Sequence, residues 1–435
     1  MLDRYTTALQ TLLGDPKTIG ILGYGMEGRS SYTVMRQLYP DTPIIVVDQN
    51  AQVEVPDHPL TAVAAGSDYM DALADCDVVL RSPGIKLEVG DYDGKVTSQA
   101  ALFTQVCRDR IIGVTGTKGK STTTTLIHHL LSGTYETALV GNIGVPPLEA
   151  LTAEYDYYVC EYSCQQLSDM EVSPRYSLLL NLYPEHLDYY ASVEEYYNTK
   201  RNIYQHQDST DHCYSVSETA SPGLQLALGT TYRIAEKRLL ATEDCIEINS
   251  QKIPYTDALA GDHNKLNQLF AIAVCLQIGL EETDIVAPLQ SFTGLPHRLE
   301  TVYEADGLRY VNDSISTIPQ STIAAIQAYD DVALVLIGGY DRGIDYSPLV
   351  VYLEQSLEVE VVLFSAVGER LSTLLQRPFV LKPSFAEGTK YTLEHHPSKG
   401  TILMSPAASS YDEFRSFVHR GDAFRQMVTA YFNEN

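Results

Sequence analysis

Residues 113–124 read GVTGTKGKSTTT, and this stretch decides the fold of the middle of the chain. An apolar run enters it, and a helix-compatible run at residues 126–131 follows it. Its glycines allow the backbone to wrap so that N–H groups point inward at a phosphate. Lys120 supplies positive charge for the outer phosphates, and the Ser121 hydroxyl can ligate Mg²⁺. The stretch therefore predicts a strand, a phosphate-binding loop and a helix.

The loop departs from the strict GxxxxGK[ST] pattern, because Val114 stands where the first glycine of that pattern belongs. A glycine turn that precedes a helix and binds nothing is the alternative interpretation. The dense Gly, Lys, Ser and Thr composition between a strand and a helix favours phosphate binding.

A second glycine-rich turn, GYGMEG at residues 23–28, follows an apolar run near the N-terminus, and Asp48 ends the next apolar run. A GxGxxG turn after a strand presents backbone N–H groups to a diphosphate, with the acidic residue on a ribose. UDP satisfies this motif as well as NAD does. A turn without a ligand also stays open, because a lone GxGxxG is weak evidence.

Composition and charge exclude several classes of protein. The net charge of −26 argues against a nucleic-acid partner, whose phosphates attract Lys and Arg. No run reaches the ~18 apolar residues of a membrane helix, and the first residues lack the pattern of a signal peptide. The seven cysteines form no CxxC pair, which is typical of free thiols in a reducing compartment. We therefore expect a cytoplasmic protein that binds neither nucleic acid nor membrane.

Apolar runs of strand length alternate with helix-compatible segments along the chain, which predicts the α/β class with largely parallel sheets. Three blocks can be separated, at residues 1–98, 99–295 and 296–435. Ligands of such folds gather at the carboxyl ends of the strands, where this chain has its polar turns. We expect three domains, each with its own sheet: a Rossmann-like domain, a P-loop domain and a second Rossmann-like domain.

Further motifs follow the loop along the chain. They are GNIG (141–144), EYSCQQL (161–167), NLYPEHLD (181–188), GDHNKLN (261–267), PHRLE (296–300), NDS (312–314), SPAASSYDEF (405–414) and RGDAF (420–424). Together with the loop, which has the form TGTxGK[ST], these strings resemble the Mur ligase family over nearly the whole chain. Within the family, the chain is most similar to the members that add D-glutamate to UDP-N-acetylmuramoyl-L-alanine in peptidoglycan precursor synthesis.

The resemblance implies a reaction and its ligands. ATP would phosphorylate the substrate carboxylate, and the amine of glutamate would then attack the acyl phosphate. Residues 1–98 would bind UDP, residues 99–295 ATP, and residues 296–435 the amino acid, so that the third domain must close to complete the site. The implied ligands are ATP, Mg²⁺, UDP-N-acetylmuramoyl-L-alanine and glutamate, and we expect a monomer.

The resemblance also implies roles for individual residues. Catalytic roles fall to Lys120, His186 and Lys200. ATP binding falls to Gly116, Thr117, Lys118, Gly119, Lys120, Ser121, Thr122, Asn264, Asn267, Arg298 and Asp313. The UDP-linked substrate would contact Met26, Glu27, Asp48, Gly84, Asn142 and His186, and the amino acid would contact Thr317, Arg342, Ser410 and Phe417. The metal ligands would be Ser121, Glu161, His186 and, if carbamylated by CO₂, Lys200.

Five of these residues have a plainer interpretation without the resemblance. Glu161 would then be a surface carboxylate at a strand end, His186 a structural histidine, and Lys200 a solvated lysine on a helix. Asn264 and Asn267 would be a capping cluster at the N-terminus of a helix.

The expected amino-acid pocket departs from the family pattern. Ile315 stands where many D-glutamate-adding members carry lysine, and Arg342 stands where relatives often carry lysine. Isoleucine cannot pair with a carboxylate, whereas arginine offers a planar fork that binds one differently. We expect D-glutamate, with L-glutamate as the alternative.

Three other hypotheses compete with a muramoyl-alanine ligase. A folylpolyglutamate synthase would lack the UDP-binding first domain. An NAD-dependent dehydrogenase would leave Lys120, Glu161 and the C-terminal motifs unexplained. A noncatalytic nucleotide-binding regulator would have no need of the full set of catalytic residue types.

Overall fold

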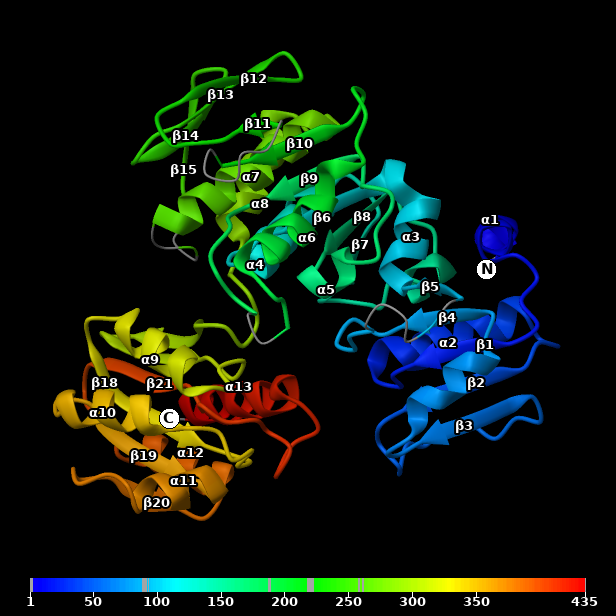
Figure 1. Ribbon diagram of the computed structural model, residues 1–435. Helices are drawn as coiled ribbons and strands as arrows, with labels where there is room; N and C mark the ends of the chain where they lie inside the picture. Colours follow the sequence, from blue (N-terminus) through cyan, green and yellow to red (C-terminus); the bar gives the residue numbers. More distant parts are fainter. Residues whose placement is uncertain are drawn as a thin grey trace. The chain divides into compact units, whose positions relative to one another are not determined.

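The computed structural model describes residues 3–87, 92, 94–186, 189–216, 223–256, 259 and 262–434. The chain forms two compact units, Met1–Phe292 and Thr293–Asn435 (Figure 1). No helix in these described ranges is both long enough and apolar enough to cross a lipid bilayer.

The N-terminal sheet of the first unit is parallel and has the strand order β3-β2-β1-β4-β5. Its inner strand β1 is entirely buried, because helices cover a run that contains no polar side chain. The strands are β1 (Ile19–Leu22), β2 (Ile44–Asp48), β3 (Thr61–Ala65), β4 (Val78–Arg81) and β5 (Lys95–Thr97). The helices are α1 (Asp3–Leu13), α2 (Met26–Leu38) and the 3₁₀ helix Tyr69–Asp75.

The central sheet is also parallel, in the order β11-β10-β9-β6-β8-β7. Strand β6 is fully buried between β9 and β8, so the loop that follows it opens beside the ends of both neighbours. The strands are β6 (Ile111–Thr115), β7 (Thr137–Gly141), β8 (Tyr157–Glu161), β9 (Tyr176–Leu179), β10 (His212–Ser215) and β11 (Leu224–Gln225). The helices are α3 (Gln99–Cys107), α4 (Lys120–Leu131), α5 (Cys164–Leu167), α6 (Val193–Gln205), α7 (Asp262–Ile278) and α8 (Glu282–Ser291), with 3₁₀ turns at Arg108–Arg110 and Glu149–Thr152.

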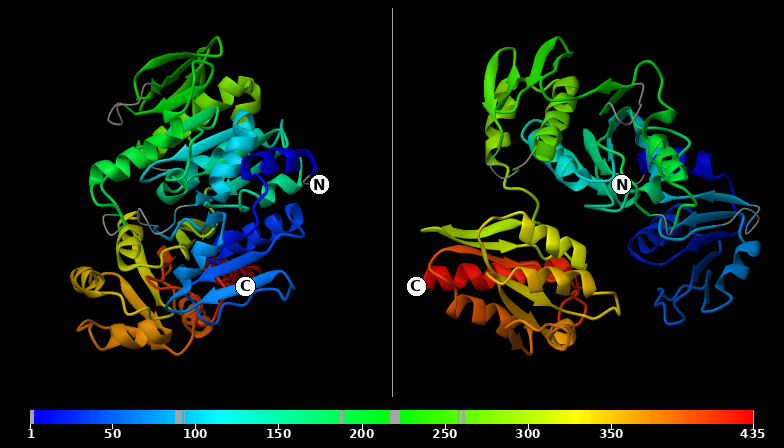
Figure 2. Two further views of the ribbon diagram at one scale, coloured as in Figure 1. Left: turned by 45° about the vertical axis from the view of Figure 1, so that its right-hand side comes forward. Right: turned by 60° about the vertical axis from the view of Figure 1, so that its left-hand side comes forward.

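A small antiparallel sheet was not expected from the sequence. It packs against α7 within the same hydrophobic core as α4, and both views in Figure 2 show it at the edge of the first unit. Its hairpins turn through positive-φ residues at Ala235–Glu236 and Asn249–Ser250, which lack the Asn-Gly signal of a tight turn. Its strands are β12 (Thr231–Ile234), β13 (Lys237–Ala241), β14 (Cys245–Ile248) and β15 (Gln251–Pro254).

The second unit is built on one mixed sheet with the order β16-β17-β21-β18-β19-β20, antiparallel only where the edge strand β16 pairs with β17. The strands are β16 (Glu300–Ala305), β17 (Leu308–Asn312), β18 (Val332–Gly338), β19 (Glu360–Phe364), β20 (Val380–Lys382) and β21 (Gly400–Met404). The helices are α9 (Pro319–Gln327), α10 (Ser347–Gln355), α11 (Ser365–Ser372), α12 (Phe385–Glu394) and α13 (Phe417–Glu434).

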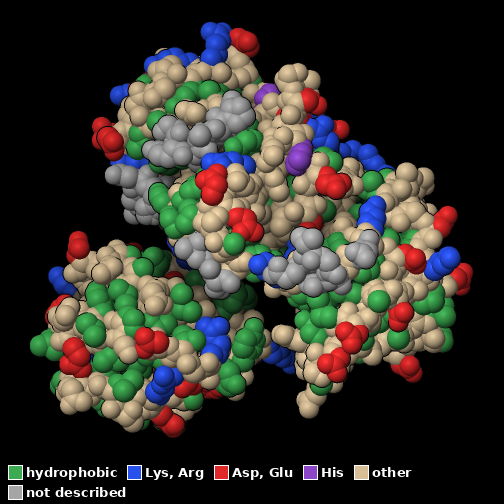
Figure 3. Space-filling view, viewed as in Figure 1, with side chains coloured by type: hydrophobic (Ala, Val, Ile, Leu, Met, Phe, Trp, Pro, Cys, Tyr) green, Lys and Arg blue, Asp and Glu red, His purple; other side chains and the backbone are tan. Residues whose placement is uncertain are grey.

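The predicted fold class is confirmed, because the three main sheets are largely parallel. The boundaries at residues 98/99 and 295/296 stay a prediction. On the face in Figure 3, Asp and Glu side chains are scattered over both units and form no single patch. That distribution fits an acidic charge that serves solubility.

Candidate active site

The predicted phosphate loop lies between β6 and α4. Gly119 has a φ of 84°, and a Cβ there would lie 2.7 Å from Oδ1 of Asn267 on α7. Gly116 has a φ of 151°, and a Cβ there would lie 3.0 Å from Cβ of Leu180. Both positions therefore require glycine, because of their backbone angles and because neighbouring elements approach closely.

Asn181, two residues beyond the end of the neighbouring strand β9, holds this loop. Its Oδ1 accepts hydrogen bonds from the N–H groups of Thr117 (3.1 Å) and Lys118 (2.8 Å), and its Nδ2 donates to the carbonyl of Lys118 (3.0 Å). Sequence reasoning assigned it no role. Its position at the start of the NLYPEHLD motif, directly after a strand, was the available signal.

Two amines converge on the loop, one part-buried and one buried. Lys120 Nζ donates to the carbonyls of Gly116 and Thr117, both at 3.1 Å. Lys200, on α6 and 1% exposed, donates to the same Gly116 carbonyl at 2.9 Å. Burial lowers the pKa of Lys120. Burial, and next the charge of Lys120, lower the pKa of Lys200 to about 7, so the plain interpretation of Lys200 as a solvated lysine is wrong.

Glu161 ends β8 beside these amines and is 1% exposed, so it is not the surface carboxylate of the plain interpretation. Asn142 Nδ2 donates to its Oε1 at 2.7 Å. Its Oε2 accepts no hydrogen bond from any residue that the structure describes. Leaving a buried carboxylate oxygen unpaired is costly, and a hard cation is the partner such an oxygen suits.

The fit to Mg²⁺ rests on a mixed set of ligands. Within the described ranges, no three His, Cys, Asp or Glu side chains gather as a ready metal site. To bind Mg²⁺, Glu161 therefore has to be joined by oxygen ligands that are not carboxylates. The Ser121 hydroxyl at the start of α4 and the phosphates of a bound nucleotide are such ligands.

His186 is exposed and has a φ of 57°. Its ring lies 5.9 Å, between centroids, from that of Tyr196, whose hydroxyl lies 3.2 Å from Thr117 Oγ1. In the same segment, Glu185 forms a partly exposed ion pair with Lys118 of the loop. The structure therefore places His186 at the edge of the phosphate loop.

The remaining residues predicted to bind ATP in the first unit also lie at this loop. Thr122 is buried in the first turn of α4, and Asn264 accepts a hydrogen bond from Asn267 Nδ2 at 3.0 Å.

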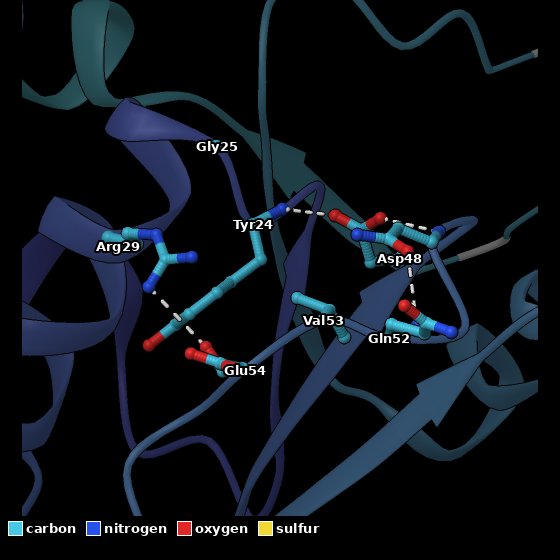
Figure 4. A pocket seen from close by; sticks show the side chains of 8 residues that line it. Tyr24, Gly25, Arg29, Asp48, Gln52, Val53 and Glu54 are labelled. Atoms are coloured by element: carbon cyan, nitrogen blue, oxygen red, sulfur yellow. Dashed lines mark hydrogen bonds between the residues drawn. The ribbon is translucent and has the colours of Figure 1, made fainter. Parts of the chain in front are cut away.

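A separate pocket of about 360 Å³ lies at the N-terminal glycine turn (Figure 4). Asp48 organises it, because its carboxylate accepts the N–H groups of Tyr24 (2.6 Å) and Asn50 (2.8 Å). A Cβ on Gly28 would lie 1.9 Å from the carbonyl oxygen of Gly23, so this turn also depends on glycine. The pocket is lined by Tyr24, Gly25, Arg29, Asp48, Asn50, Gln52, Val53 and Glu54.

Only Asp48 of the residues predicted to contact UDP lines this pocket. Met26 is 72% exposed, and Gly84 is exposed in the loop after β4. Glu27 instead accepts a hydrogen bond from Gln166 of the central part at 2.7 Å, and burial raises its pKa. Arg29, whose guanidinium lies over the Tyr24 ring in Figure 4, was missed by sequence reasoning because a lone exposed arginine carries no motif.

In the second unit, Asp313 directly follows β17 and is 2% exposed. Its Oδ2 accepts from Ser405 Oγ at 2.7 Å, and its Oδ1 from the N–H of Leu299 at 3.3 Å. Burial raises its pKa to about 6 despite these hydrogen bonds. The neighbouring Arg298 is exposed.

The residues predicted to bind the amino acid lie on loops of this second unit. Arg342 Nη2 donates to the carbonyl of Thr317 at 2.8 Å, which brings these two together. Ser410 is buried, and Phe417 begins α13, where its carbonyl accepts from Ser314 Oγ at 2.8 Å.

Arg420 was missed although it is fully buried. It donates to Ser314 and to the carbonyls of Ala408 and Ser409. It thereby joins the loop after β17 to the loop after β21.

A parallel α/β fold, a lysine-bearing glycine loop and a buried, half-paired carboxylate define a nucleotide-phosphate-binding protein. Comparison with known proteins narrows the class: residues 114–275 match the Mur ligase middle domain. The chain is 33% identical to the UDP-N-acetylmuramoyl-L-alanine–L-glutamate ligase of Salinispora tropica, over 95% of this chain and 97% of that protein. It is 29% identical to the UDP-N-acetylmuramoylalanine–D-glutamate ligase of Acetivibrio thermocellus, over 84% and 85%. The chain belongs to the Mur ligase family, as the motifs predicted.

A solved structure supports the fold. MurF ligase from Thermotoga maritima, determined in complex with ADP, superposes with a TM-score of 0.53 at 15% identity, over 96% of this chain and 95% of that one.

Proposed function

We propose that the chain is an ATP-dependent ligase that joins glutamate to UDP-N-acetylmuramoyl-L-alanine in peptidoglycan precursor synthesis. The observation that carries the proposal is the pair of lysines at the phosphate loop, the part-buried Lys120 and the buried Lys200, beside the buried Glu161 carboxylate with one oxygen that has no partner among the described residues. The names of the Salinispora and Acetivibrio relatives supply the substrates. A cytoplasmic, monomeric enzyme with domains 1–98, 99–295 and 296–435 is part of the proposal.

The chemistry consists of two displacements. The substrate carboxylate attacks the γ-phosphorus of ATP, ADP leaves, and an acyl phosphate forms. The glutamate amine then attacks the acyl carbon, phosphate leaves, and the amide nitrogen loses a proton. Both steps move charge across phosphoryl oxygens, so they depend on positioning and charge neutralisation. The Lys120 ammonium and the loop N–H groups supply that neutralisation.

Mg²⁺ would neutralise further phosphoryl charge, with Glu161, Ser121 and His186 as the residues that hold it. Lys200 would complete this set as a carbamate. A neutral amine attacks CO₂, forms an N–C bond and releases a proton. A pKa of about 7 leaves much of the Lys200 amine neutral at cellular pH. The resulting carbamate is an anion, and a bound Mg²⁺ would offset the cost of burying its charge.

ATP contacts for Asn264, Asn267, Arg298 and Asp313, and amino-acid contacts for Thr317, Arg342, Ser410 and Phe417, belong to the same proposal. The buried Asp313 and the Arg342–Thr317 hydrogen bond support it.

L-glutamate is a second candidate for the amino acid, in place of the D-glutamate that the motifs favoured. Ile315 is half-buried in the loop after β17 and offers no charge to a carboxylate. The relative with L-glutamate in its name is 33% identical over 95% of the chain, against 29% over 84% for the one with D-glutamate.

The test is phosphate release with Mg-ATP and UDP-N-acetylmuramoyl-L-alanine, run with D-glutamate, with L-glutamate and without amino acid. We expect release that depends on one enantiomer. Release with D-glutamate alone would overturn the L-glutamate candidate, and the reverse result would overturn the D-glutamate expectation. Release with neither would overturn the proposed function.

A further inference from the structure

Arg81 ends β4 in the N-terminal sheet and is 7% exposed, although nothing in the motifs assigns it a role. Its guanidinium donates to three segments of the chain, one close to it in sequence and two far away. Nη1 donates to the carbonyl of Ile85 (2.5 Å) and to the Tyr189 hydroxyl (3.2 Å). Nη2 donates to Ser168 Oγ and Asp169 Oδ1, both at 2.7 Å.

The Ile85 contact closes the turn that carries Gly84. Within that turn, the Ile85 N–H donates to the carbonyl of Ser82 (3.1 Å), and Ser82 Oγ donates to the carbonyl of Gly23 (2.9 Å). Arg81 therefore steadies a loop that is tied to the N-terminal glycine turn and its pocket.

The other contacts reach the segments that carry the candidate catalytic groups. Ser168 and Asp169 follow α5, the short helix that starts three residues after Glu161. The N–H of Tyr189 donates to the carbonyl of His186 at 3.0 Å. The Arg81 guanidinium thus joins the loop after β4, which lies beside the proposed UDP-binding turn, to the two segments that follow Glu161 and His186.

We propose that Arg81 is a positioning residue that sets the UDP-linked substrate in register with the catalytic loop; this rests on the proposed function. An arginine suits the task because its planar fork makes several hydrogen bonds of fixed direction, which a lysine cannot reproduce. Arg81 is buried against Asp169, whose side chain is only 18% exposed, so solvent and salt screen this ion pair little.

The test compares Arg81→Met and Arg81→Lys with a matched control, Arg4→Met. Arg4 on α1 also pairs with a central residue, Glu154, but both side chains are exposed, at 53% and 78%. For Arg81→Met we expect the KM for the UDP-linked substrate to rise about tenfold, kcat to fall about tenfold and the KM for ATP to stay within about twofold. Arg81→Lys should lie between Arg81→Met and wild type, and Arg4→Met should match wild type.

Asp169→Asn serves as a second variant, because it removes the charge at nearly constant volume. Asp169→Asn should raise the KM for the UDP-linked substrate and lower kcat, each by a smaller factor than Arg81→Met. A purely structural role would lower the melting temperature and the active fraction with both KM values unchanged, and that result would overturn the inference.

Calorimetric titration with UDP separates the two hypotheses, since it needs no turnover. Wild type that releases no phosphate with either glutamate overturns the proposed function. Arg81→Met should still bind UDP about fivefold more weakly than wild type and Arg4→Met. Equal UDP affinity in Arg81→Met and wild type would overturn the role of Arg81.

Discussion

The two glycine-rich turns of the first unit share a backbone plan but differ in charge. Each follows an inner strand of a parallel sheet, leads into a helix, and contains a glycine with a φ of 84°, Gly23 in one and Gly119 in the other. A side chain at or just beyond the end of a neighbouring strand accepts an N–H hydrogen bond from each turn. It is the carboxylate of Asp48 at the N-terminal turn and the neutral amide of Asn181 at the central one.

The cations around the turns differ as well. The buried Lys200 and the part-buried Lys120 face the central turn, whereas the exposed Arg29 is the cation that lines the N-terminal pocket. Glycine therefore specifies the turn, and the charges around it specify the ligand. A triphosphate that must react needs buried positive charge, while a diphosphate that only anchors a substrate needs oriented N–H groups.

The largest effect on activity should follow removal of the positive charge of Lys120 at the central turn. Lys120→Met should lower kcat about a thousandfold, because an amine directed at phosphoryl oxygens in a buried site stabilises the transition state far more than it would in water. Phosphate release under saturating substrates measures this. Lys118→Met is the matched control, since that lysine is 70% exposed and pairs with Glu185; it should lose less than about tenfold. Equal losses in the two variants would contradict the distinction between the part-buried Lys120 and the exposed Lys118.

The second prediction concerns the stability cost of Lys200. Its folded-state pKa of about 7 lies below the unfolded value of about 10.4, so the unfolded chain binds more protons between these values. Stability contributed by the wild-type lysine therefore rises as pH increases from 7 to 10.5. Below pH 7 the cost is on the order of 4 kcal/mol. Lys200→Met lacks this cost, and should gain stability while losing most of its activity.

Urea unfolding at several pH values, in buffer free of CO₂, measures that difference. The stability advantage of Lys200→Met should be greatest at pH 6 and should shrink toward pH 10. An advantage that does not change with pH would show that Lys200 is not a buried, proton-binding amine in the folded state.

The sequence allowed the central turn to be predicted almost completely, because glycines, lysines and apolar strands are local signals. The strands 157–161 and 332–338 follow from the same logic, since buried parallel strands are continuous apolar runs. The antiparallel sheet at β12 to β15 could not be found this way. Its strands are short, half-exposed and joined by turns without glycine.

Residues that act through long-range contacts were also out of reach. Asn181, Arg81 and Arg420 each make contacts with segments 63 to 108 positions away, besides nearer ones, and no local pattern encodes such a distant partner. Burial of Glu161 and Lys200 likewise depends on how the sheet and α6 pack, which periodicity alone does not reveal.

Breaking the N-terminal turn by steric means should have the third-largest effect. In Gly28→Ala the new Cβ would lie 1.9 Å from the Gly23 carbonyl oxygen, so the turn must open at a cost of about 3 kcal/mol. Gly25→Ala is the control, because a Cβ there meets nothing within 4 Å and the φ of −72° suits alanine. Thermal unfolding measures both variants. The KM for the UDP-linked substrate should rise in Gly28→Ala alone; a comparable rise in Gly25→Ala would show that the turn's shape is not what matters.

The smallest effect should come from making the two turns alike. Asp48→Asn gives the N-terminal turn an amide in the place that Asn181 occupies in the central one. The amide oxygen can still accept the Tyr24 N–H, but its NH₂ group then faces the N–H of Asn50, so one charge-assisted hydrogen bond is lost. A loss of about 1.5 kcal/mol follows, which corresponds to a roughly tenfold weaker affinity for UDP, with the KM for ATP unchanged. Asp57→Asn, an exposed position in the same part of the chain, controls for the change in net charge. Tighter UDP binding in Asp48→Asn would instead mean that the carboxylate repels the diphosphate more than it organises the turn, and the two turns would then differ by charge alone.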